Sequence, residues 1–443
     1  MSRKSVSEIM LILLLIGTLT LAFNIQPAKA TGTIHIRADG SIDPPTAPIQ
    51  RNGDLYTLTE NINDADGIVI ERNNMTLDGA DYTVKGTGVL GSAGIALGGN
   101  NVTIKNINVE SFGCGLWLDT CSNNSIIGSN VSAQKIYGIA LINSSHNIVS
   151  RNKMTNNGWD GLRLEYSTNN NISENYVESN GWYGICLVWS PNNTLSRNKM
   201  NYNEGNLGIF CHDADEAINL IDTTNLVNGK PVYYFINERD FVISPATYPQ
   251  IGYLGLINCA NVTVEGLTMT KNGQGLQLVS INNSRIINNN VVDNAWVGIY
   301  IRLSSNNTVW GNNCTNNGFS GIHISGSSNN SVFGNNIADT FTFDQGSIYD
   351  IYGWGVSLVN LSSNNSIYEN RISRNYGGIW LYNCSSNNLI YHNNFINNTS
   401  QVRDESWYDP SVSPSVNSWD DNYPSGGNYW SDYVGNDTCS GPY

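Results

Sequence analysis

The feature that most constrains this chain is a repeat that returns mostly every 23 residues and begins Gly-(Ile/Leu)-x-(Ile/Leu). A unit this short has room for two or three strands and too few apolar residues to fold alone, so neighbouring units must stack around a shared core. The unit starts are Gly94, Gly115, Gly138, Gly161, Gly184 and Gly208, then Gly275, Gly298, Gly321, Gly355 and Gly378. The sequence therefore predicts a solenoid that grows in one dimension.

Apolar residues alternate with polar ones within each unit. The first and third residues after the glycine are apolar, as in Leu116 and Leu118, and this period of two is that of a β-strand. Two more apolar sites follow in each unit. Three strands with one inward face per coil predict an all-β, triangular parallel β-helix. Degenerate units at Gly67 and Tyr253 bring the predicted size to about thirteen coils.

Asparagine marks two corners of each coil. Pairs such as Asn170-Asn171 recur at one corner, and single residues such as Asn175 recur at another. Asn tolerates the left-handed turn conformation, and coils that stack at about 4.8 Å place equal amides above one another, where they can form hydrogen-bonded ladders. The same residues create N-x-Ser/Thr sequons, among them those at Asn74, Asn101, Asn130, Asn143, Asn171, Asn261 and Asn360. We favour a structural origin for most sequons, with glycosylation of the outward ones as the alternative.

The chain divides into four regions. Residues 1–30 have the pattern of a secretory signal peptide, with basic Arg3-Lys4, an apolar run and the small-residue end Ala28-Lys29-Ala30. Residues 31–66 are predicted to cap a β-helix that covers 67–400, and residues 401–443, where the repeat stops, to cap its other end. Insertions at 212–251 and 340–352 break the rhythm and are expected to project from one corner. The first contains Asn228-Gly229, which predicts a β-hairpin.

Charge excludes one class of partner. Only 13% of the 443 residues are charged, and the formal net charge is −14. Removing the leader takes three of the 22 basic and one of the 36 acidic residues, so 19 and 35 remain and the net charge becomes about −16. An acidic chain lacks the basic face that nucleic acid requires, so we predict no nucleic-acid partner. The leader predicts an extracytoplasmic protein that is secreted, periplasmic or on the cell surface. Membrane association through an uncleaved leader or a missing C-terminal anchor stays open.

Eight cysteines are scattered along the chain, without the CxxC pairs of a zinc site or the dense spacing of a disulfide scaffold. We expect most of them to be buried strand residues. Cys114 and Cys121 form the pair for which a disulfide is hardest to dismiss, because an exported protein allows disulfides without requiring them.

Several segments resemble the NosD-like periplasmic β-helix proteins, in particular exported members of archaeal type. They are Tyr56-Thr57-Leu58, Val227-Asn228-Gly229-Lys230-Pro231-Val232-Tyr233-Tyr234, Leu256-Ile257-Asn258-Cys259 and Gly427-Asn428-Tyr429-Trp430-Ser431-Asp432-Tyr433. The resemblance implies a right-handed β-helix with carbohydrate-binding and sugar-hydrolase-type repeats, in a family named for a copper-handling accessory of nitrous oxide reductase maturation. Such proteins usually continue beyond the point where this chain ends, so a truncated cap is one interpretation of the tail.

Metal binding was weighed from the residue types. Copper prefers clustered His, Met or Cys ligands, whereas the five histidines outside the leader fall in different coils. Cys211 is expected at an inward apolar position, with His212 beside it on the outer face next to the first insertion. This dipeptide is the candidate copper site. Calcium, held by acidic residues, is the other ion that stays open as a cofactor.

Catalysis has one candidate cluster. Polysaccharide cleavage needs paired carboxylates, or acidic residues that hold a cation beside a basic proton acceptor. Asp160, Arg163 and Glu165 share one coil, and Asp119 lies two coils away, at about 9.6 Å from the stacking distance. Salt bridges on the surface would explain these residues equally well.

A stripe of aromatic and hydrogen-bonding residues runs along one predicted edge. Residues two and four positions after the glycine, together with those just before it, supply the candidate carbohydrate-binding set, which is Trp117, Asp119, Trp159, Arg163, Glu165, Trp182, Trp296, Tyr300, Arg302 and Trp380. Exposed rings interleaved with planar polar groups suit the apolar faces and hydroxyls of sugars. Alternatively, the rings only stabilise the sheet as stacked ladders.

From these patterns we predict an exported, non-catalytic β-helix protein that binds carbohydrate, such as a glycan of the cell envelope, or another cell-surface polymer along the aromatic edge. Two alternatives stay open. One is a polysaccharide lyase or hydrolase that uses the Asp160, Arg163 and Glu165 face, and the other is a copper-handling accessory protein that uses Cys211 and His212.

Overall fold

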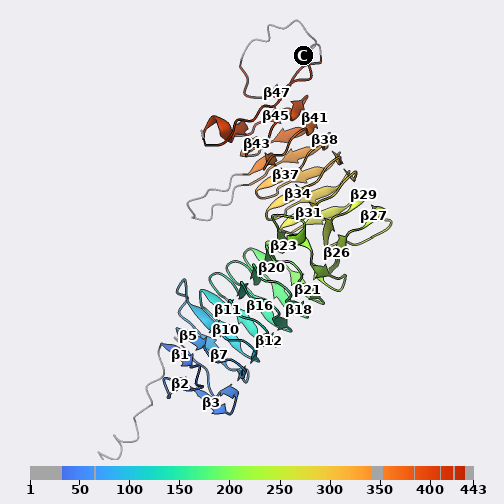
Figure 1. Ribbon diagram of the computed structural model, residues 1–443. Coiled ribbons are helices and arrows are strands. Elements are labelled where there is room, and N and C mark those ends of the chain that lie inside the picture. The colour runs from blue at the N-terminus through green and yellow to red at the C-terminus, as the bar shows by residue number, and fades with distance from the viewer. Residues whose placement is uncertain are drawn as a thin grey trace, which may run out of the picture.

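The computed structural model describes residues 32–63, 66–341, 353–383, 385–409, 411–422 and 425–434. They form an elongated stack of short strands with two one-turn 3-10 helices, η1 (Asp215–Ala217) and η2 (Glu405–Trp407) (Figure 1). The predicted all-β parallel β-helix is confirmed. The leader predicted at 1–30, most of the second insertion and the chain from residue 435 onward lie outside the described residues.

The N-terminal stack comprises the coils up to β25, and two of its sheets end within it. Sheet A consists of β2 (Ile42–Asp43), β1 (Thr33–Ile36), β5 (Gly67–Ile70), β8 (Ala93–Leu97), β11 (Cys114–Asp119), β14 (Ile139–Ile142), β17 (Leu162–Glu165), β20 (Tyr183–Val188) and β23 (Gly205–Phe210). Sheet B consists of β24 (Leu220–Ile221), β21 (Thr194–Ser196), β18 (Asn171–Ser173), β15 (Ile148–Ser150), β12 (Ser125–Ile127), β9 (Val102–Lys105), β6 (Met75–Asp78), β4 (Leu55–Leu58) and β3 (Ile49–Asn52).

A long sheet crosses from one stack to the other. Its N-terminal strands are β7 (Thr83–Lys85), β10 (Asn108–Glu110), β13 (Asn130–Ser132), β16 (Lys153–Thr155), β19 (Tyr176–Glu178), β22 (Lys199–Asn201) and β25 (Leu226–Val227). It continues as β26 (Lys230–Ile236), β28 (Tyr253–Ile257), β31 (Gln274–Val279), β34 (Val297–Arg302), β37 (Ser320–Ser325), β40 (Trp354–Val359), β43 (Gly377–Leu381) and β46 (Ser400–Asp404).

The C-terminal stack begins at β26 and adds two sheets of its own. Sheet F consists of β27 (Arg239–Ile243), β29 (Ala260–Glu265), β32 (Arg285–Ile287), β35 (Thr308–Trp310), β38 (Ser331–Phe333), β41 (Ser366–Tyr368) and β44 (Leu389–Tyr391). Sheet G consists of β30 (Thr268–Thr270), β33 (Asn290–Val292), β36 (Asn313–Thr315), β39 (Asn336–Ala338), β42 (Arg371–Ser373), β45 (Asn394–Ile396) and β47 (Tyr429–Trp430). The structure has more coils than the predicted thirteen, because β1, β26 and β46 add strands that pair in register but lack the glycine signature.

Two separate apolar cores fill the two stacks. One extends from Ile34 to Tyr253 and the other from Ile243 to Phe395. The residues predicted to point inward, such as Leu116, are fully buried. Since each coil of a solenoid contacts only its neighbours, it buries its apolar residues against the coils above and below it.

Buried asparagine ladders fix the register of the coils. Asn147 Nδ2 donates to Asn170 Oδ1 at 3.1 Å, and Asn175 Nδ2 donates to Asn198 Oδ1 at 2.9 Å, so the ladders predicted at two corners are confirmed. Each Oδ1 also accepts a backbone amide from the neighbouring coil, as Asn170 does from Asn147 at 2.8 Å. A third ladder, not predicted, contains Asn157, Asn180 and Asn203.

Most sequon asparagines lie outside these ladders. Those named above are exposed, except for half-buried Asn130. Most of the exposed ones, namely Asn74, Asn101, Asn143, Asn261 and Asn360, have positive φ. The turn conformation therefore accounts for the residue type, and glycosylation stays a prediction.

The first insertion is the junction between the stacks. Strands β25 and β26 pair antiparallel across Asn228 and Gly229, whose φ angles are 47° and 78°, so the predicted hairpin is confirmed. The expectation that residues 212–251 project from the solenoid is wrong. The segment completes the last N-terminal coil with β24 and β25, and starts the next stack with β26 and β27. The rod bends at this place in Figure 1.

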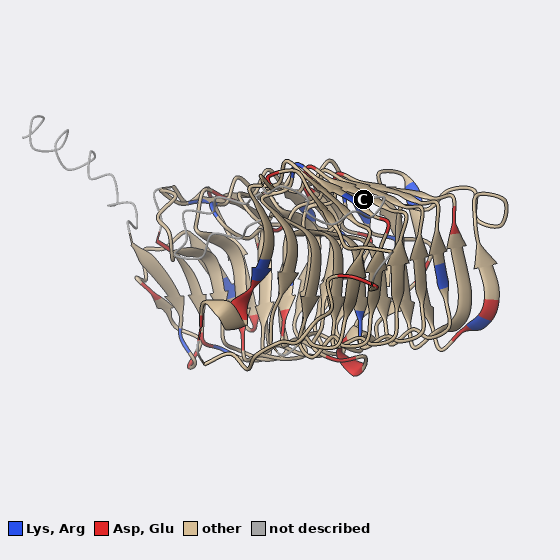
Figure 2. Cartoon of the chain, turned by 90° about the horizontal axis from the view of Figure 1, so that it is seen from above, with Lys and Arg blue, Asp and Glu red and all other residues tan. Residues whose placement is uncertain are grey.

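The described cysteines are buried and free. Cys114 and Cys121 are both unpaired, so the disulfide considered for them does not form. Cys384 and Cys439 lie outside the described residues. Among the described residues, no helix has the length and apolar character to cross a bilayer. Lys, Arg, Asp and Glu are few and scattered over the strands, and no basic face stands out in Figure 2.

Candidate functional site

The predicted stripe is two stripes on two different sheets. Trp117 and Arg163 lie on the outer face of sheet A, in columns that end at β23. Tyr300 and Trp380 lie on the outer face of the long sheet. In the N-terminal stack this sheet continues through β25 and not through the strands of sheet A. The one edge predicted for these residues is therefore divided between two sheets, because the hairpin at the junction changes which strand of the coil each sheet contains.

The register of the last N-terminal coil also differs from the prediction. Gly208 faces Cys186 and not Gly184, so the glycine start assigned to this coil is two residues too late. Phe210 consequently pairs with Val188, in the column that contains Glu165. Asp119 stands in the same column, two coils before Glu165, as predicted.

The two stripes meet at the junction. The rings of Phe210 from sheet A and Trp296 from the long sheet lie 4.8 Å apart. A small apolar cluster outside both main cores joins Cys211 to Val279 and Tyr300. The ring contacts continue on either side, in the order Tyr137, Trp159, Trp182, Tyr183, Phe210, Trp296, Phe319 and Trp380. These rings thus pack against one another between coils, as in the ladder alternative, and the same rings form an aromatic row that joins the two stacks.

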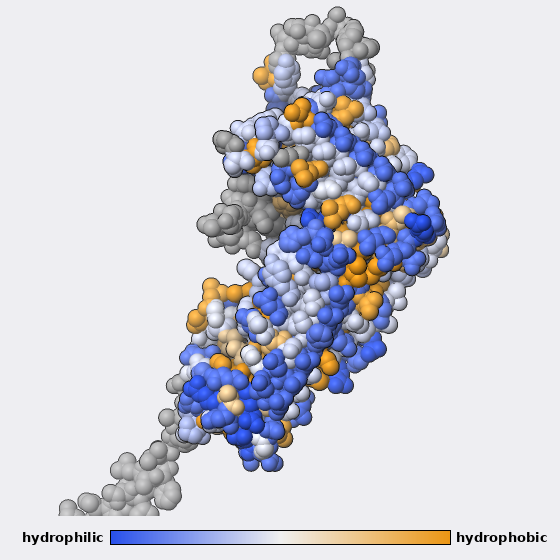
Figure 3. Space-filling view, in the orientation of Figure 1, coloured by the Kyte–Doolittle hydropathy of each residue, from blue (hydrophilic) through white to orange (hydrophobic). Residues whose placement is uncertain are grey.

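A cleft of about 310 Å³ opens where the stripes meet. It is lined by Trp189, Phe210, Cys211, Trp296, Tyr300, Arg302, Phe319, His323, Val359, Asn360, Trp380 and Tyr382. Apolar residues are also visible on the surface around the bend in Figure 3. Of the residues predicted for carbohydrate binding, Trp296, Tyr300, Arg302 and Trp380 line this cleft, and the other six lie along sheet A and its edge.

Polar groups in the cleft are held by specific bonds. Arg302 donates from Nε and Nη2 to the His212 carbonyl oxygen, at 2.8 and 2.6 Å, and from Nη1 to Ser325 Oγ at 2.9 Å. These bonds tie the long sheet to the end of the N-terminal stack. Burial lowers the pKa of His323 to about 3, so this ring is neutral, and no described residue forms a hydrogen bond with its buried Nδ1. Trp380 Nε1 donates to Glu405 at 3.0 Å.

Asp160, Arg163 and Glu165 come together as predicted, with Asp160 buried and Arg163 and Glu165 half-buried. Arg163 donates from Nη1 to Asp160 Oδ2 at 3.2 Å and from Nε to Glu165 Oε2 at 2.9 Å, and its guanidinium lies over the Tyr137 ring. Asp160 Oδ1 accepts the backbone amide of Tyr183 at 3.1 Å. Asp160 is only 2% exposed, and burial raises its pKa to about 6. The salt bridges of the alternative interpretation therefore form, although one of the two carboxylates, that of Asp160, lies below the surface.

Cys211 and His212 do not converge on a common point of the surface. Cys211 is buried as expected, but in the apolar cluster between the stacks and not in the inner core. Burial raises the pKa of its thiol to about 12, which disfavours the thiolate that binds metals. His212 is exposed, its ring stacks on Trp189 with centroids 4.6 Å apart, and its Nδ1 lies 3.4 Å from Glu216.

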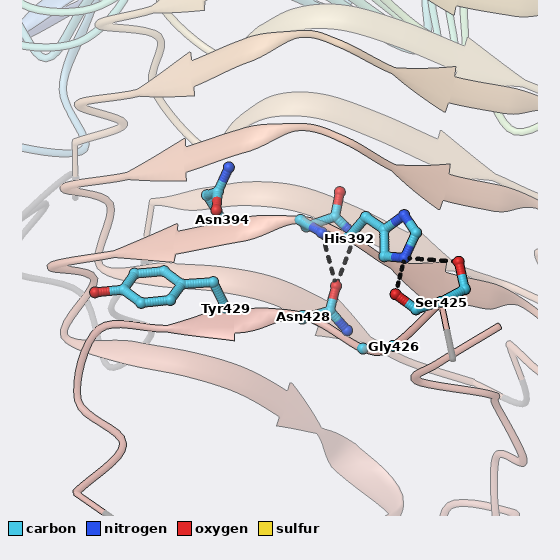
Figure 4. A pocket seen from close by; sticks show the side chains of 8 residues that line it. His392, Asn394, Ser425, Gly426, Asn428 and Tyr429 are labelled. Carbon is cyan, nitrogen blue, oxygen red and sulfur yellow. Dashed lines mark hydrogen bonds between the residues drawn. The ribbon is translucent and has the colours of Figure 1, made fainter. Parts of the chain in front are cut away.

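A second hollow, of about 620 Å³, lies at the C-terminal cap (Figure 4). His392 Nε2 bonds to the Ser425 carbonyl oxygen at 2.9 Å, and Asn393 Nδ2 donates to Asn428 Oδ1 at 2.9 Å. The asparagine ladder thus ends in the cap, where these polar groups bond to one another. The hollow thus lies where the cap closes the end of the stack.

Sequence reasoning missed two aromatic features. Trp189 lies at a corner outside the glycine pattern, yet lines the cleft. A separate column on the outer face of sheet F stacks Trp310, Phe333, Tyr368 and Tyr391. The available signal for this column was the ring that stands three residues after the buried corner asparagine in four coils, at Asn307, Asn330, Asn365 and Asn388.

The fold and the cleft together define the class, a parallel β-solenoid of stacked Asn-cornered coils with an aromatic junction. The chain belongs to the family described as periplasmic copper-binding protein (NosD), whose model matches residues 57–239, 253–370 and 353–435. The predicted resemblance is confirmed. Among curated proteins, none matches this chain.

Several solved structures are similar in architecture. The A-module of mannuronan C-5 epimerase AlgE6 from Azotobacter vinelandii is 14% identical with a TM-score of 0.31, and the match covers 85% of this chain and 88% of that one. A mutant of the periplasmic alginate epimerase AlgG is 14% identical with a TM-score of 0.33 and coverages of 78% and 79%. The catalytic domain of a GH87 α-1,3-glucanase is 14% identical with a TM-score of 0.29, and the match covers 83% of this chain and 57% of that one. Likeness at this level carries no conclusion about activity.

The copper of the family description does not fit the described residues. Over these residues, no group of three or more His, Cys, Asp or Glu side chains is placed to hold a metal ion. The candidate Cys211 is a buried protonated thiol, and His212 is engaged with Trp189 and Glu216. We therefore derive no step through copper or calcium.

Proposed function

We propose that the protein binds a polysaccharide or another cell-surface polymer outside the cytoplasm, and does not cleave it. The observation that carries the proposal is the convergence of two aromatic stripes on one cleft of about 310 Å³. Aromatic faces suit the apolar faces of sugar rings, and a few placed polar groups set the orientation of a ligand. Arg302 and Asn360 supply such groups here.

The aromatic edge extends the contact beyond the cleft. Trp159 is 41% exposed on the sheet A side and contacts Trp182, and Trp117 lies half-buried farther along the same sheet. A polymer that occupies the cleft would follow these rings along the N-terminal stack. The place outside the cytoplasm is supported by the periplasmic description of the family and by the leader pattern at 1–30.

Binding is favoured over catalysis by the chemistry of the cleft lining. None of the described residues that line the cleft carries a carboxylate, whereas glycoside hydrolysis uses two of them across the scissile bond. In the alternative cluster Asp160 is buried, and both of its carboxylate oxygens already accept hydrogen bonds. A substrate would have to displace Arg163 to reach it.

A polysaccharide pull-down with the full chain tests the proposal, with reducing ends and unsaturated products assayed in parallel. We expect retention of at least one neutral or acidic polymer, loss of retention in Trp296→Ala and Trp380→Ala, and no products. The Trp310→Ala variant is the matched control, because Trp310 lies in the column of sheet F, away from the cleft. The polymer should retain this variant as it retains the wild type. Product formation that Asp160→Asn abolishes would replace this proposal with a lyase or hydrolase.

A further inference from the structure

Arg302 differs from the other arginines in its surroundings. Among the described residues, Arg37, Arg72, Arg163, Arg197, Arg374 and Arg403 each form an ion pair with a carboxylate. Arginines without such a pair are Arg51, Arg151, Arg239, Arg285 and Arg371, and all of them are exposed. Arg302 alone is half-buried and has no carboxylate partner within the described part of the chain. The cleft therefore contains a cation that forms no ion pair with these residues.

The guanidinium of Arg302 is held in a fixed position with donor capacity left over. A guanidinium has five N–H donors in one plane. Three are used, by the carbonyl oxygen of His212 and by Ser325 Oγ. The remaining contact, from Nη1 to the Tyr300 hydroxyl, is 3.5 Å long. No hydrogen bond of the described residues takes the second proton of Nη2, so a planar group is oriented in advance for an incoming acceptor.

The charge of Arg302 acts on the rest of the cleft. Burial lowers the pKa of His323, and the neighbouring Arg302 lowers it further. Burial raises the pKa of the Cys211 thiol, the positive charge of Arg302 lowers it, and Glu216 and Asp213 each raise it by less than Arg302 lowers it. Arg302 thus lies close enough to both of these cleft residues to act on their ionisation.

We infer that the cleft selects an acidic polysaccharide, whose anionic group pairs with Arg302 while its sugar ring lies against Trp296 and Trp380. The anion is a carboxylate, as in a uronic acid, or a sulfate ester, since an oxygen of either can accept a charge-assisted hydrogen bond from the remaining proton of Nη2. This inference rests on the proposed polymer binding. The net charge of −14 repels a polyanion over most of the surface, so binding of this kind is confined to the cleft and its edge.

Matched polymers test the inference without a mutation. The full chain is titrated with polygalacturonate and its carboxyl-reduced neutral form, and with dextran sulfate and dextran. We expect the acidic member of one pair to bind about tenfold more tightly or better, and raising NaCl from about 0.05 M to about 0.5 M to reduce that preference. Which pair responds distinguishes a carboxylate from a sulfate.

Variants separate charge from structure. Arg302→Gln should abolish the preference for the acidic polymer while binding of its neutral partner is kept, and Arg302→Lys should retain part of the preference. Melting curves of both variants report whether the bond to His212 matters for the fold. Equal affinity for acidic and neutral members overturns the inference and leaves polymer binding intact, whereas failure of all four polymers to bind counts against both.

Discussion

The two stacks have separate interiors that are built in the same way, but their outer faces differ. In both, buried amides form ladders between coils, as Asn175 does with Asn198 and Asn335 does with Asn370. On sheet A the outer column continues from Trp117 through Ala140 to Arg163. The corresponding column of the long sheet contains the rings of Tyr300, His323 and Trp380, interrupted by Ser357. The repeated apolar and asparagine positions thus determine the core, while the outward positions are free to vary. The proposed binding surface lies at the junction between the two stacks.

The largest expected effect concerns the ladders. Asn175→Ala removes an acceptor of two Asn152 N–H groups and a donor to Val149, all buried, so the free energy of unfolding should fall by about 3 to 4 kcal/mol. Asn335→Ala should cost about as much in the other stack. Chemical denaturation measures both.

Because the stacks have separate cores, each variant should shift a different transition of the unfolding curve. Asn171→Ser, at an exposed position, is the control and should change stability by less than about 0.5 kcal/mol. A single transition that both variants shift equally would contradict independent stacks.

A pH-dependent effect distinguishes the N-terminal stack. Burial raises the pKa of Asp160 to about 6, so the folded state keeps its proton at a pH where the unfolded state has lost it. The stability linked to this proton is fully present below about pH 4 and is lost as pH rises through about 6, a change of about 3 kcal/mol at most. Asp160→Asn should remove this slope in denaturation experiments between about pH 4 and about pH 7. An unchanged slope would argue against a buried, titrating Asp160.

Ligand affinity should depend on the cleft more than on sheet A. Trp380→Ala should weaken polymer binding about 10- to 30-fold, because one stacking surface is lost. Trp117→Ala, farther along sheet A, should weaken it by about threefold or less. Isothermal titration with the same polymer compares the two, and the reverse order would move the binding centre to the N-terminal stack.

The smallest effect is expected on sheet F. Trp310 stacks on Phe333, and its column does not line the cleft. Trp310→Ala should therefore leave affinity within about twofold of the wild type, as the same titration would show. A larger loss would indicate that the aromatic column of sheet F is a second part of the binding surface.

The sequence predicts the interior of this protein well and its outer surface less well. Period-two apolar residues and corner asparagines depend only on neighbouring coils, so Leu116 and the Asn170 ladder followed directly from the repeat. The junction depends on residues far apart in the chain. That Arg302 would bond to His212, 90 positions away, could not be derived from spacing, because the hairpin at Asn228 shifts the sheets relative to each other.

The site shows the same limit. Trp296 and Trp380 were identified from their position in the repeat, but their convergence with Phe210 required the geometry of the bend. Trp189 escaped notice because its corner has no glycine signature. The burial of Asp160 was hidden too, since a strand end with alternating charges is typical of an exposed face.

The central claim is that the junction cleft binds a polymer without cleaving it. Hydrogen–deuterium exchange of the full chain with and without a retained polysaccharide tests this most directly, with products assayed in the same samples. The account predicts increased protection in β23, β34, β37 and β43, little change in sheet F, and an intact polymer. Protection confined to sheet F or to the Asp160 coil, or release of sugar products, would contradict it.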